Sequence, residues 1–262
     1  MGKEVVGITG ASGFIGRALI DKFETDGVKY RVIDRIHNLS DQVGDCTAMI
    51  HLGSINDSSS PDIQMANVEY TQSLIGVLPA DCILIFTSSF AVYKTPSKDE
   101  IITEDYPTDP RNRYGQTKLE AEKFIERSGL NAWILRLSNA YGSGMPPFKH
   151  SVVATFNELI KQDKELTIDG DGSQTRDFLN VEDVVLAINL CLKQESTGVQ
   201  ILNICSGVET SLNNLVQKLS QKQHKKPKLK YNTAADMTTA GYWKGDWSKA
   251  HKLLGWKPTI YI

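Results

Sequence analysis

The chain has almost no net charge, few cysteines and no long apolar run. Its 262 residues include 29 basic and 31 acidic side chains, a net charge of −2, so no overall field attracts nucleic acid or anionic lipid. No stretch approaches the roughly 20 apolar residues that a transmembrane helix requires. The apolar opening at 5–8 is interrupted by glycine too early for a signal peptide. These absences predict a cytoplasmic protein that binds neither nucleic acid nor membrane.

The four cysteines are scattered along the chain. They form no CxxC pair and have no histidine at metal-ligand spacing, which argues against a metal site and against a disulfide framework. Cys82 and Cys191 lie within apolar runs, as buried thiols in a reducing compartment do. With 40% hydrophobic and 23% charged residues, the composition is that of an ordinary globular protein, and we predict no metal.

Short apolar segments alternate with segments of helical periodicity along the first half of the chain, which predicts a parallel sheet with helices on both faces. We expect strands at 3–9, 29–34, 48–52, 82–87 and 132–137, and helices at 14–23, 62–78 and 110–127, the last capped by Asp109. Beyond residue 142 the alternation loosens, with helices expected at 152–161, 182–193 and 211–221 and strands at 165–168 and 200–204. The length fits one extended α/β domain or one and a half.

A lysine-rich segment, QKQHKKPKLK at 221–230, allows two interpretations. It could bind nucleic acid, or it could be a solvated turn between a helix and a strand. No aromatic residue is interleaved for base stacking, so the turn is favoured.

The first expected strand is followed by a glycine-rich loop that opens the first expected helix. Such a loop could be only a tight turn, but its glycines also let the backbone approach a pyrophosphate at a helix N-terminus, where free N–H groups favour phosphate. The strand before it, the helix after it and an acid after the second strand support the second interpretation. The predicted cofactor contacts here are Gly10, Ser12, Gly13, Phe14, Ile15 and Gly16.

The acid is Asp34, at the end of the second expected strand. A carboxylate there accepts hydrogen bonds from adenosine ribose hydroxyls and repels a 2′-phosphate, so NAD is favoured over NADP. The adjacent Arg35 complicates this preference, because an arginine can pair with that phosphate. Alternatively, Arg35 is an exposed residue that stacks on the adenine.

Tyr114 and Lys118 lie four residues apart in an expected helix and therefore share a face. Such pairs also arise by chance, but Ser88 and Ser89 follow a neighbouring strand at the carboxyl edge where ligands of parallel sheets bind. A nearby ammonium and an oxidised nicotinamide would both lower the pKa of the phenol, which is ordinarily near 10. Tyr114 could then exchange a proton with a substrate hydroxyl while a hydride moves to the cofactor.

These features together resemble the extended short-chain dehydrogenase/reductase superfamily, in its NAD-dependent nucleotide-sugar epimerase/dehydratase branch. The resemblance covers nearly the whole chain. Its motifs, in order, are the GxxGxxG loop at 10–16, Asp34, HLGS at 51–54, TSSFAVY at 87–93, YGQTK at 114–118, RLSNAYG at 136–142, GDGSQTRDFLNVEDV at 170–184 and LGWKP at 254–258.

The resemblance implies a role for each matching residue. Tyr114 would be the acid/base, Lys118 would lower its pKa and hold the nicotinamide ribose, and Ser89, rather than Ser88, would be the catalytic serine. Further implied contacts are Leu52, Gly53 and Asn67 to the cofactor, and Asn139 and Arg176 to the sugar nucleotide and its diphosphate. Arg176 could instead form an ion pair with Asp177 or Asp183.

The resemblance also implies the architecture, a Rossmann-type doubly wound parallel sheet with a smaller C-terminal substrate domain. The NAD-binding part would comprise 1–144 with 180–205, and the substrate-binding part 145–179 with 206–262. Helices 62–78 and 110–127 would pair with their copies in a homodimer.

The chain departs from the family pattern in several places. Phe90 and Ala91 stand where dehydratases carry an Asp-Glu pair, so 4,6-dehydration is not expected. The 34–48 segment is too short for the usual edge strand and helix, which we predict to be missing, with Asp45 at best a remnant. The family usually has an arginine that binds the diphosphate, but the sequence at 234–237 contains no basic residue. Lys244 is a candidate for that contact instead. The chain ends soon after 254–258, where the family normally adds a helix.

The pattern favours an NAD-dependent epimerase that acts on a nucleoside-diphosphate sugar through a transient 4-keto intermediate. An NAD(P)H-dependent 4-keto-sugar-nucleotide reductase would use the same residues, and a non-catalytic NAD-binding sensor or scaffold is a third interpretation.

Overall fold

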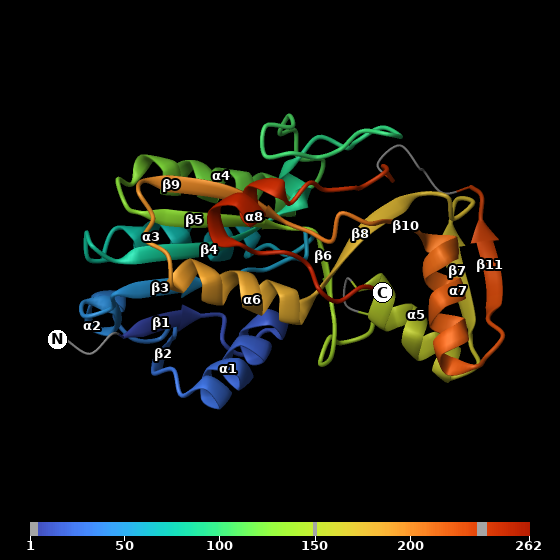
Figure 1. Ribbon diagram of the computed structural model, residues 1–262, viewed down its shortest axis with the longest axis horizontal. Helices are drawn as coiled ribbons and strands as arrows, with labels where there is room; N and C mark the ends of the chain where they lie inside the picture. Colours follow the sequence, from blue (N-terminus) through green and yellow to red (C-terminus); the bar gives the residue numbers. More distant parts are fainter. Residues whose placement is uncertain (1–4, 149–150, 235–239) are drawn as a thin grey trace.

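A six-stranded parallel sheet organises the larger lobe of the computed structural model, which describes residues 5–148, 151–234 and 240–262 (Figure 1). The strand order is β2-β1-β3-β4-β5-β9, and each neighbouring pair runs parallel. The bounds are β1 Val6–Thr9, β2 Tyr30–Ile33, β3 Ala48–His51, β4 Ile83–Ser89, β5 Ala132–Leu137 and β9 Val199–Ile204. β1, β3 and β5 are buried along their whole length, as strands covered on both faces must be. The predicted doubly wound α/β fold is confirmed.

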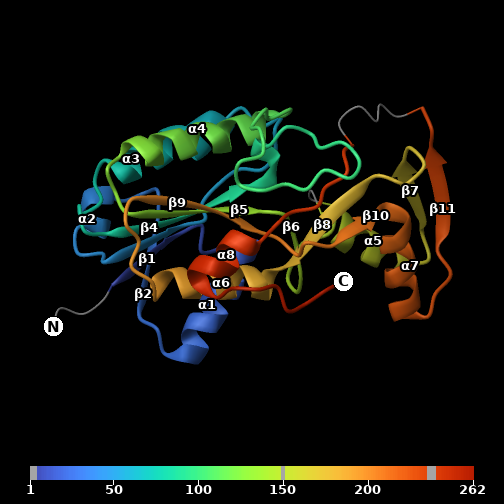
Figure 2. The same ribbon diagram turned by 45° about the horizontal axis from the view of Figure 1, so that its top comes forward.

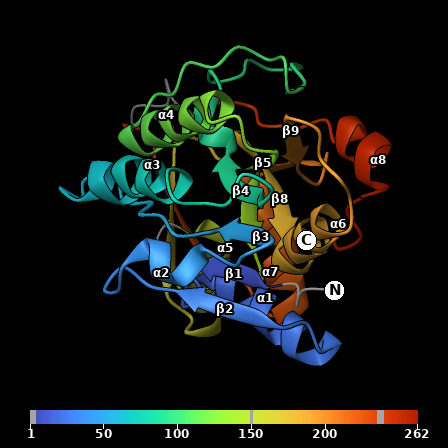
Figure 3. The same cartoon turned by 90° about the vertical axis from the view of Figure 1, so that its left-hand side faces the viewer.

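Helices cover both faces of this sheet (Figures 2 and 3). On one face lie α1 (Phe14–Asp26), α6 (Val181–Leu192) and α8 (Ser248–Leu254), and on the other α2 (Leu39–Val43), the π-helical turn η1 (Met65–Glu69), α3 (Tyr70–Ile75) and α4 (Arg113–Arg127). Each face has its own apolar cluster. Ala250, Leu254 and the fully buried Trp256 belong to the cluster under α1 and α6. The segment 248–256 thus packs on the large sheet, although sequence analysis assigned it to the smaller unit.

The smaller lobe is built around a separate apolar cluster (Figure 1). Its helices are α5 (Val152–Lys161) and α7 (Leu212–Gln223), and its two-stranded parallel sheet pairs β7 (Glu165–Asp169) with β11 (Lys228–Asn232). The lysine-rich segment forms the turn from α7 into β11, in agreement with the favoured interpretation. No helix in the described ranges is long and apolar enough to cross a membrane.

A three-stranded sheet of β6 (Asn139–Tyr141), β8 (Thr175–Asn180) and β10 (Glu209–Ser211) joins the two lobes. The carboxylate of Asp177 in β8 is fully buried and accepts five hydrogen bonds, from Ser138 Oγ at 2.9 Å, Ser206 N and Oγ at 2.7 and 2.8 Å, Gly207 N at 2.9 Å and Gly245 N at 3.2 Å. Burial raises the pKa of this carboxyl, and the hydrogen bonds oppose the rise. Asp177 therefore ties three separate chain segments together where the lobes meet.

The predicted loss of an edge unit after β2 is confirmed, because β2 ends the sheet and the segment to β3 contains only the five-residue α2. At the end of β2 the side-chain amide of Gln42 bonds the backbone N–H and C=O of Asp34, which a neighbouring strand could otherwise have bonded. Its Oε1 accepts from Asp34 N at 3.0 Å and its Nε2 donates to Asp34 O at 3.3 Å. Asp45 pairs with Arg31 on the same edge, with 3.0 Å between Nη2 and Oδ2.

Five of the six expected helices have limits that differ from those predicted, and the differences are largest for the helices expected at 62–78 and 110–127. α4 begins at Arg113, not at 110, because Asn112 rather than Asp109 is its N-cap and accepts from Gly115 N at 2.8 Å. The single helix expected at 62–78 is shorter, spanning the π turn η1 and then α3. The predicted bounds of α5 and β5 are confirmed.

Candidate active site

Three adjoining cavities follow the carboxyl edge of the large sheet. The nucleotide cavity, of about 580 Å³, lies between the glycine-rich loop and the end of β2. The central cavity, of about 330 Å³, lies over the ends of β4 and β5, and the outer cavity, of about 640 Å³, extends toward β8 and Trp243. The nucleotide and central cavities share four lining residues, Gly10, Gly13, Leu52 and Ser54. The central and outer cavities share six, Asn56, Ser89, Tyr114, Leu137, Ser138 and Asn139. One groove therefore passes from β2 to Arg176.

The glycine-rich loop leaves no room for side chains where it meets its neighbours. Gly10 has a φ of +70°, and a Cβ there would lie 2.6 Å from Gly53 N. A Cβ on Gly16 would lie 2.3 Å from Gly10 O. Gly10, Ser12 and Gly13 line the nucleotide cavity, and Phe14, Ile15 and Gly16 line the central one. No side chain caps the N-terminus of α1, which suits a phosphate group at this cradle.

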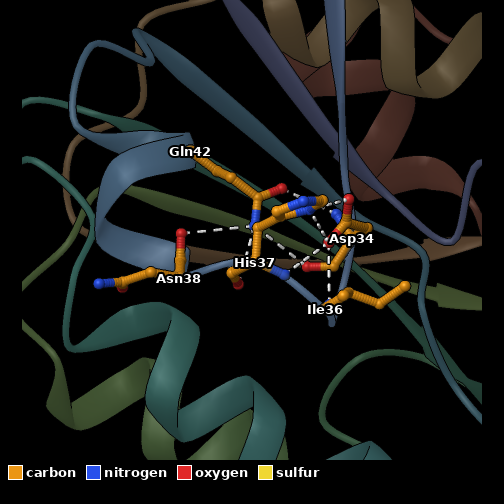
Figure 4. Close-up of polar contacts among 5 residues, drawn as sticks. All are labelled: Asp34, Ile36, His37, Asn38 and Gln42. Carbon is orange, nitrogen blue, oxygen red and sulfur yellow. Dashed lines mark hydrogen bonds and ion pairs between the residues drawn. The ribbon is translucent and has the colours of Figure 1, made fainter.

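Asp34 is held by the loop that follows it (Figure 4). Its Oδ1 accepts from the backbone N of Ile36 and of His37, each at 2.9 Å, and His37 Nδ1 lies 3.0 and 2.9 Å from its two oxygens. These contacts, led by the His37 backbone N–H, lower the pKa of Asp34 to about 2. The side chain is still 42% exposed and lines the nucleotide cavity as a carboxylate.

Arg35 lies over an aromatic ring of the protein. Its guanidinium carbon is 5.1 Å from the centroid of the Tyr70 ring, and both residues line the nucleotide cavity. The Tyr70 hydroxyl is buried and has no hydrogen-bond partner among the described residues. A buried hydroxyl without a partner next to a carboxylate and a guanidinium fits a polar ligand such as the adenosine end of a dinucleotide.

Asn67 does not line the groove, although it was expected to touch the cofactor. Its side chain is 1% exposed. Its amide accepts from Ile55 N at 2.7 Å and donates to Ile55 O at 2.8 Å and to Thr117 Oγ1 at 3.0 Å. These three bonds engage the Asn67 amide within the protein, and a contact of Asn67 with the cofactor stays a prediction. Leu52 and Gly53, expected alongside it, do line the nucleotide cavity.

Ser89, Tyr114 and Lys118 all line the central cavity. Lys118 is 2% exposed, donates from Nζ to Thr87 O at 2.8 Å, and lies 6.0 Å from the centroid of the Tyr114 ring. Ser88 also lines the central cavity, but its hydroxyl donates to the buried carboxylate of Glu122. Of the two serines, only Ser89 lines both the central and the outer cavity, as Tyr114 does.

Burial dominates the protonation of this cluster. It raises the pKa of Tyr114 to about 12, with the Ser89 hydrogen bond opposing. It lowers the pKa of Lys118 to about 7, with Glu122 opposing. Among the causes that shift the Tyr114 pKa, the expected depression by Lys118 does not appear, and burial makes Tyr114 a neutral phenol in this environment.

Arg176 lines the outer cavity without a carboxylate partner among the described residues. Its Nη1 donates to Thr175 O at 2.7 Å and to Ala240 O, and burial lowers its pKa. The ion pairs considered for it do not form. Asp177 is occupied as described above, and Asp183 accepts from Thr259 N, Thr259 Oγ1 and Ile260 N. A half-buried guanidinium that faces a cavity in this way is suited to an anionic group.

Sequence reasoning missed several residues of the outer cavity. Trp243, Thr95 and Arg111 come from three loops that carry no motif, so no local signal could have brought them together. Asn139, which was expected, lines both the central and the outer cavity. No cluster of three or more His, Cys, Asp or Glu side chains in the described ranges is arranged to hold a metal ion.

Comparison with known proteins agrees with this geometry. The model of the NAD dependent epimerase/dehydratase family matches residues 6–205. This chain belongs to that family. A UDP-glucuronate 4-epimerase of Thermodesulfobacterium geofontis is 31% identical over 69% of this chain and 55% of its own length. The human dTDP-D-glucose 4,6-dehydratase is 36% identical over 52% of this chain and 39% of its own length.

A solved structure of the same fold covers almost the whole molecule. MoeE5 in complex with UDP-glucuronic acid and NAD has a TM-score of 0.87 and 25% identity, over 98% of this chain and 94% of that one. Within this epimerase/dehydratase family the present chain has the apolar Phe90, 4% exposed, and Ala91 directly after Ser89. The segment 234–237, which stands where the family has its arginine motif, lies outside the described ranges from residue 235 onward. Lys244, the candidate substitute for that arginine, is not among the residues that line the outer cavity.

Proposed function

We propose that the protein is an NAD-dependent epimerase that inverts a hydroxyl-bearing carbon of a nucleoside-diphosphate sugar through a transient 4-keto intermediate. The observation that carries the proposal is the position of Ser89, Tyr114 and Lys118. They lie where the groove from the glycine-rich loop meets the cavity lined by Arg176.

The nucleotide cavity and central cavity fit NAD. The glycine cradle would hold the pyrophosphate, Asp34 would accept from the adenosine ribose, and Lys118 would hold the nicotinamide ribose. NAD held by these residues would supply a hydride acceptor and donor for the sugar carbon, and inversion would require the keto sugar to turn over between the two transfers. NADP is less favoured because the Asp34 carboxylate, with a pKa of about 2, is charged across the physiological range.

Tyr114 would exchange the proton of the sugar hydroxyl. As a phenolate it would take that proton while the hydride leaves the same carbon, and it would give the proton back in the return step. Its pKa of about 12 must fall for this, and the positive charges of Lys118 and of an oxidised nicotinamide act in that direction. Ser89 would hold the reacting oxygen.

The outer cavity would take the sugar nucleotide. Arg176 would pair with the diphosphate and Asn139 would bind the sugar nucleotide beside it. The solved relative binds UDP-glucuronic acid, which is consistent with such a substrate here. The apolar Phe90 and Ala91 offer no acid to expel water, so the proposal excludes 4,6-dehydration.

Turnover with a panel of UDP-, GDP- and dTDP-sugars tests the proposal. The wild type should give the inverted sugar without net NADH, and Tyr114→Phe should lower kcat by about 10³-fold while keeping NADH affinity. Tyr106→Phe is the matched control, since that hydroxyl bonds Glu100 outside the groove. Failure of every sugar to invert would contradict the proposal.

A 4-keto-sugar-nucleotide reductase is the second candidate, because it would use the same cluster. Net consumption of NAD(P)H with a keto sugar would favour it, whereas NAD retained in freshly purified protein would favour the epimerase. NADH binding without turnover of any kind would point instead to a sensor or scaffold.

The remaining expectations stay predictions. They are the division into a cofactor-binding and a substrate-binding domain, apart from the 248–256 segment, a homodimer through helices 62–78 and 110–127, and a cytoplasmic location. Light scattering on the purified protein would decide the oligomeric state.

A further inference from the structure

We propose that His51 is a positioning residue of the active site, which helps to fix the cofactor-contacting loop after β3 against the catalytic helix α4 through buried hydrogen bonds that reach the backbone of Asn67 and continue from its side chain. The inference rests on the proposed function, because it concerns how the groove is held in shape for the cofactor.

His51 is the last residue of β3 and is 1% exposed. Its ring lies against those of Tyr70 and Phe86, at centroid distances of 5.9 and 5.5 Å. Nδ1 is 2.6 Å from Thr9 Oγ1, and Nε2 is 2.8 Å from Thr71 Oγ1. Both ring nitrogens are therefore engaged, one toward β1 and one toward α3.

The direction of each hydrogen bond follows from counting protons. Thr71 Oγ1 donates its one hydrogen to Asn67 O at 2.7 Å. It must therefore accept the hydrogen bond from His51, which means that Nε2 of His51 carries the proton. Thr9 Oγ1 accepts from Gly53 N at 3.2 Å and has its own hydrogen free to donate to Nδ1. Burial, with the charges of Lys118 and Arg35, keeps the pKa of His51 low, at about 3, so this neutral tautomer persists at physiological pH.

The chain of bonds reaches both halves of the active site. At one end is Gly53, whose neighbours Leu52 and Ser54 also line the nucleotide cavity. At the other end the side chain of Asn67 accepts from Ile55 N and donates to Ile55 O and to Thr117 Oγ1. Thr117 in turn donates to Tyr114 O at 2.9 Å.

Every side chain of this chain is nearly inaccessible. Thr9, His51, Thr71, Asn67 and Thr117 are at most 2% exposed, so water cannot replace a broken link. A polar chain of this kind is costly unless every member is satisfied. Because its ends lie at the cofactor loop and at the catalytic helix, loss of a middle link should loosen the groove without removing any group that touches a ligand.

NADH binding, followed by fluorescence, tests the inference. His51→Leu should weaken NADH affinity by about tenfold or more, as expected for two lost buried hydrogen bonds. His51→Gln can still donate toward Thr71 and should recover most of that loss. Ile50→Val is the matched control, since Ile50 is a fully buried neighbour in the other apolar cluster.

Thermal melts separate positioning from general destabilisation. If His51→Leu and Ile50→Val lower Tm similarly but only His51→Leu weakens NADH binding, the inference stands. Equal NADH affinity in wild type, His51→Leu and His51→Gln would overturn it. If His51→Leu does not fold, Thr71→Val removes the next link and carries the same expected loss and the same overturning result. Failure of the wild type to bind NADH would instead refute the proposed function.

Discussion

The two ends of the groove are built in different ways. At the cofactor end the shape depends on a glycine-rich loop, because the Cβ positions of Gly10 and Gly16 are already filled by Gly53 N and Gly10 O. The substrate end is lined by Arg176 from β8 and by Trp243 and Thr95 from two loops that are distant in the sequence. The first end can therefore tolerate little change, whereas the second can be altered one side chain at a time.

This difference separates what is shared with relatives from what belongs to this chain. A backbone cradle at a helix N-terminus binds any pyrophosphate, so the same motif serves many substrates. Under the proposed function, specificity for one sugar nucleotide would come from the outer cavity. Perturbing the two ends separately should therefore change cofactor binding and substrate binding independently.

The largest expected effect concerns Lys118, which is buried between the two ends. Its pKa is lowered from 10.5 to about 7, so from pH 7 to about 10.5 the unfolded chain binds one more proton than the folded one, and stability rises with pH across that window. Lys118→Met should raise the free energy of unfolding near pH 6 by about 3 kcal/mol and remove this slope. Urea unfolding at several pH values measures it, with the exposed Lys123→Met as control. A variant less stable than wild type at pH 6 would contradict it.

The second prediction tests whether the glycine-rich loop at the cofactor end binds NADH. Gly16→Ala places a Cβ within 2.3 Å of Gly10 O, so the loop must shift and NADH affinity should fall by about a hundredfold. Titration calorimetry measures the loss. In the control Gly76→Ala the nearest atom is 3.5 Å away, and affinity should not change. Threefold or smaller loss in Gly16→Ala would show that the loop does not bind the cofactor.

The smallest expected effect is on UDP-sugar binding by Arg176 at the substrate end. Arg176→Gln removes a charge that has no carboxylate partner among the described residues, and it should weaken binding of a UDP-sugar by about tenfold with NADH affinity unchanged. Lys244→Gln removes a nearby charge that does not line the cavity and is the control. If both variants bind the UDP-sugar equally well, Arg176 does not hold the diphosphate.

Sequence alone predicted the large sheet well because its strands are short apolar runs and its ligand-binding loops carry motifs. It missed β6, β8 and β10, and it gave no bounds for the strand expected after the lysine-rich turn, which is β11. β8 contains Arg176 and Asp177, whose placement depends on partners far away in the sequence, and every residue of β11 is exposed, so neither shows an apolar pattern.

The same limit applies to individual site residues. Ser89 could be preferred to Ser88 from its place in a motif. The buried hydrogen bonds of Asn67, by contrast, depend on Ile55 and Thr117, and the raised pKa of Tyr114 depends on burial. These are properties of packing, which a linear pattern does not contain.

The missing edge unit leaves the sheet with a free strand, and free strands invite pairing with other molecules. Here that hazard is countered locally. Gln42 occupies both the N–H and the carbonyl of Asp34, and Arg31 and Asp45 place opposite charges along the same edge. A partner strand that pairs with β2 (Tyr30–Ile33) would bury the charges of Arg31 and Asp45, and one that extends past Ile33 would also have to displace the Gln42 amide. Loss of these side chains should therefore appear first as aggregation and not as lost catalysis.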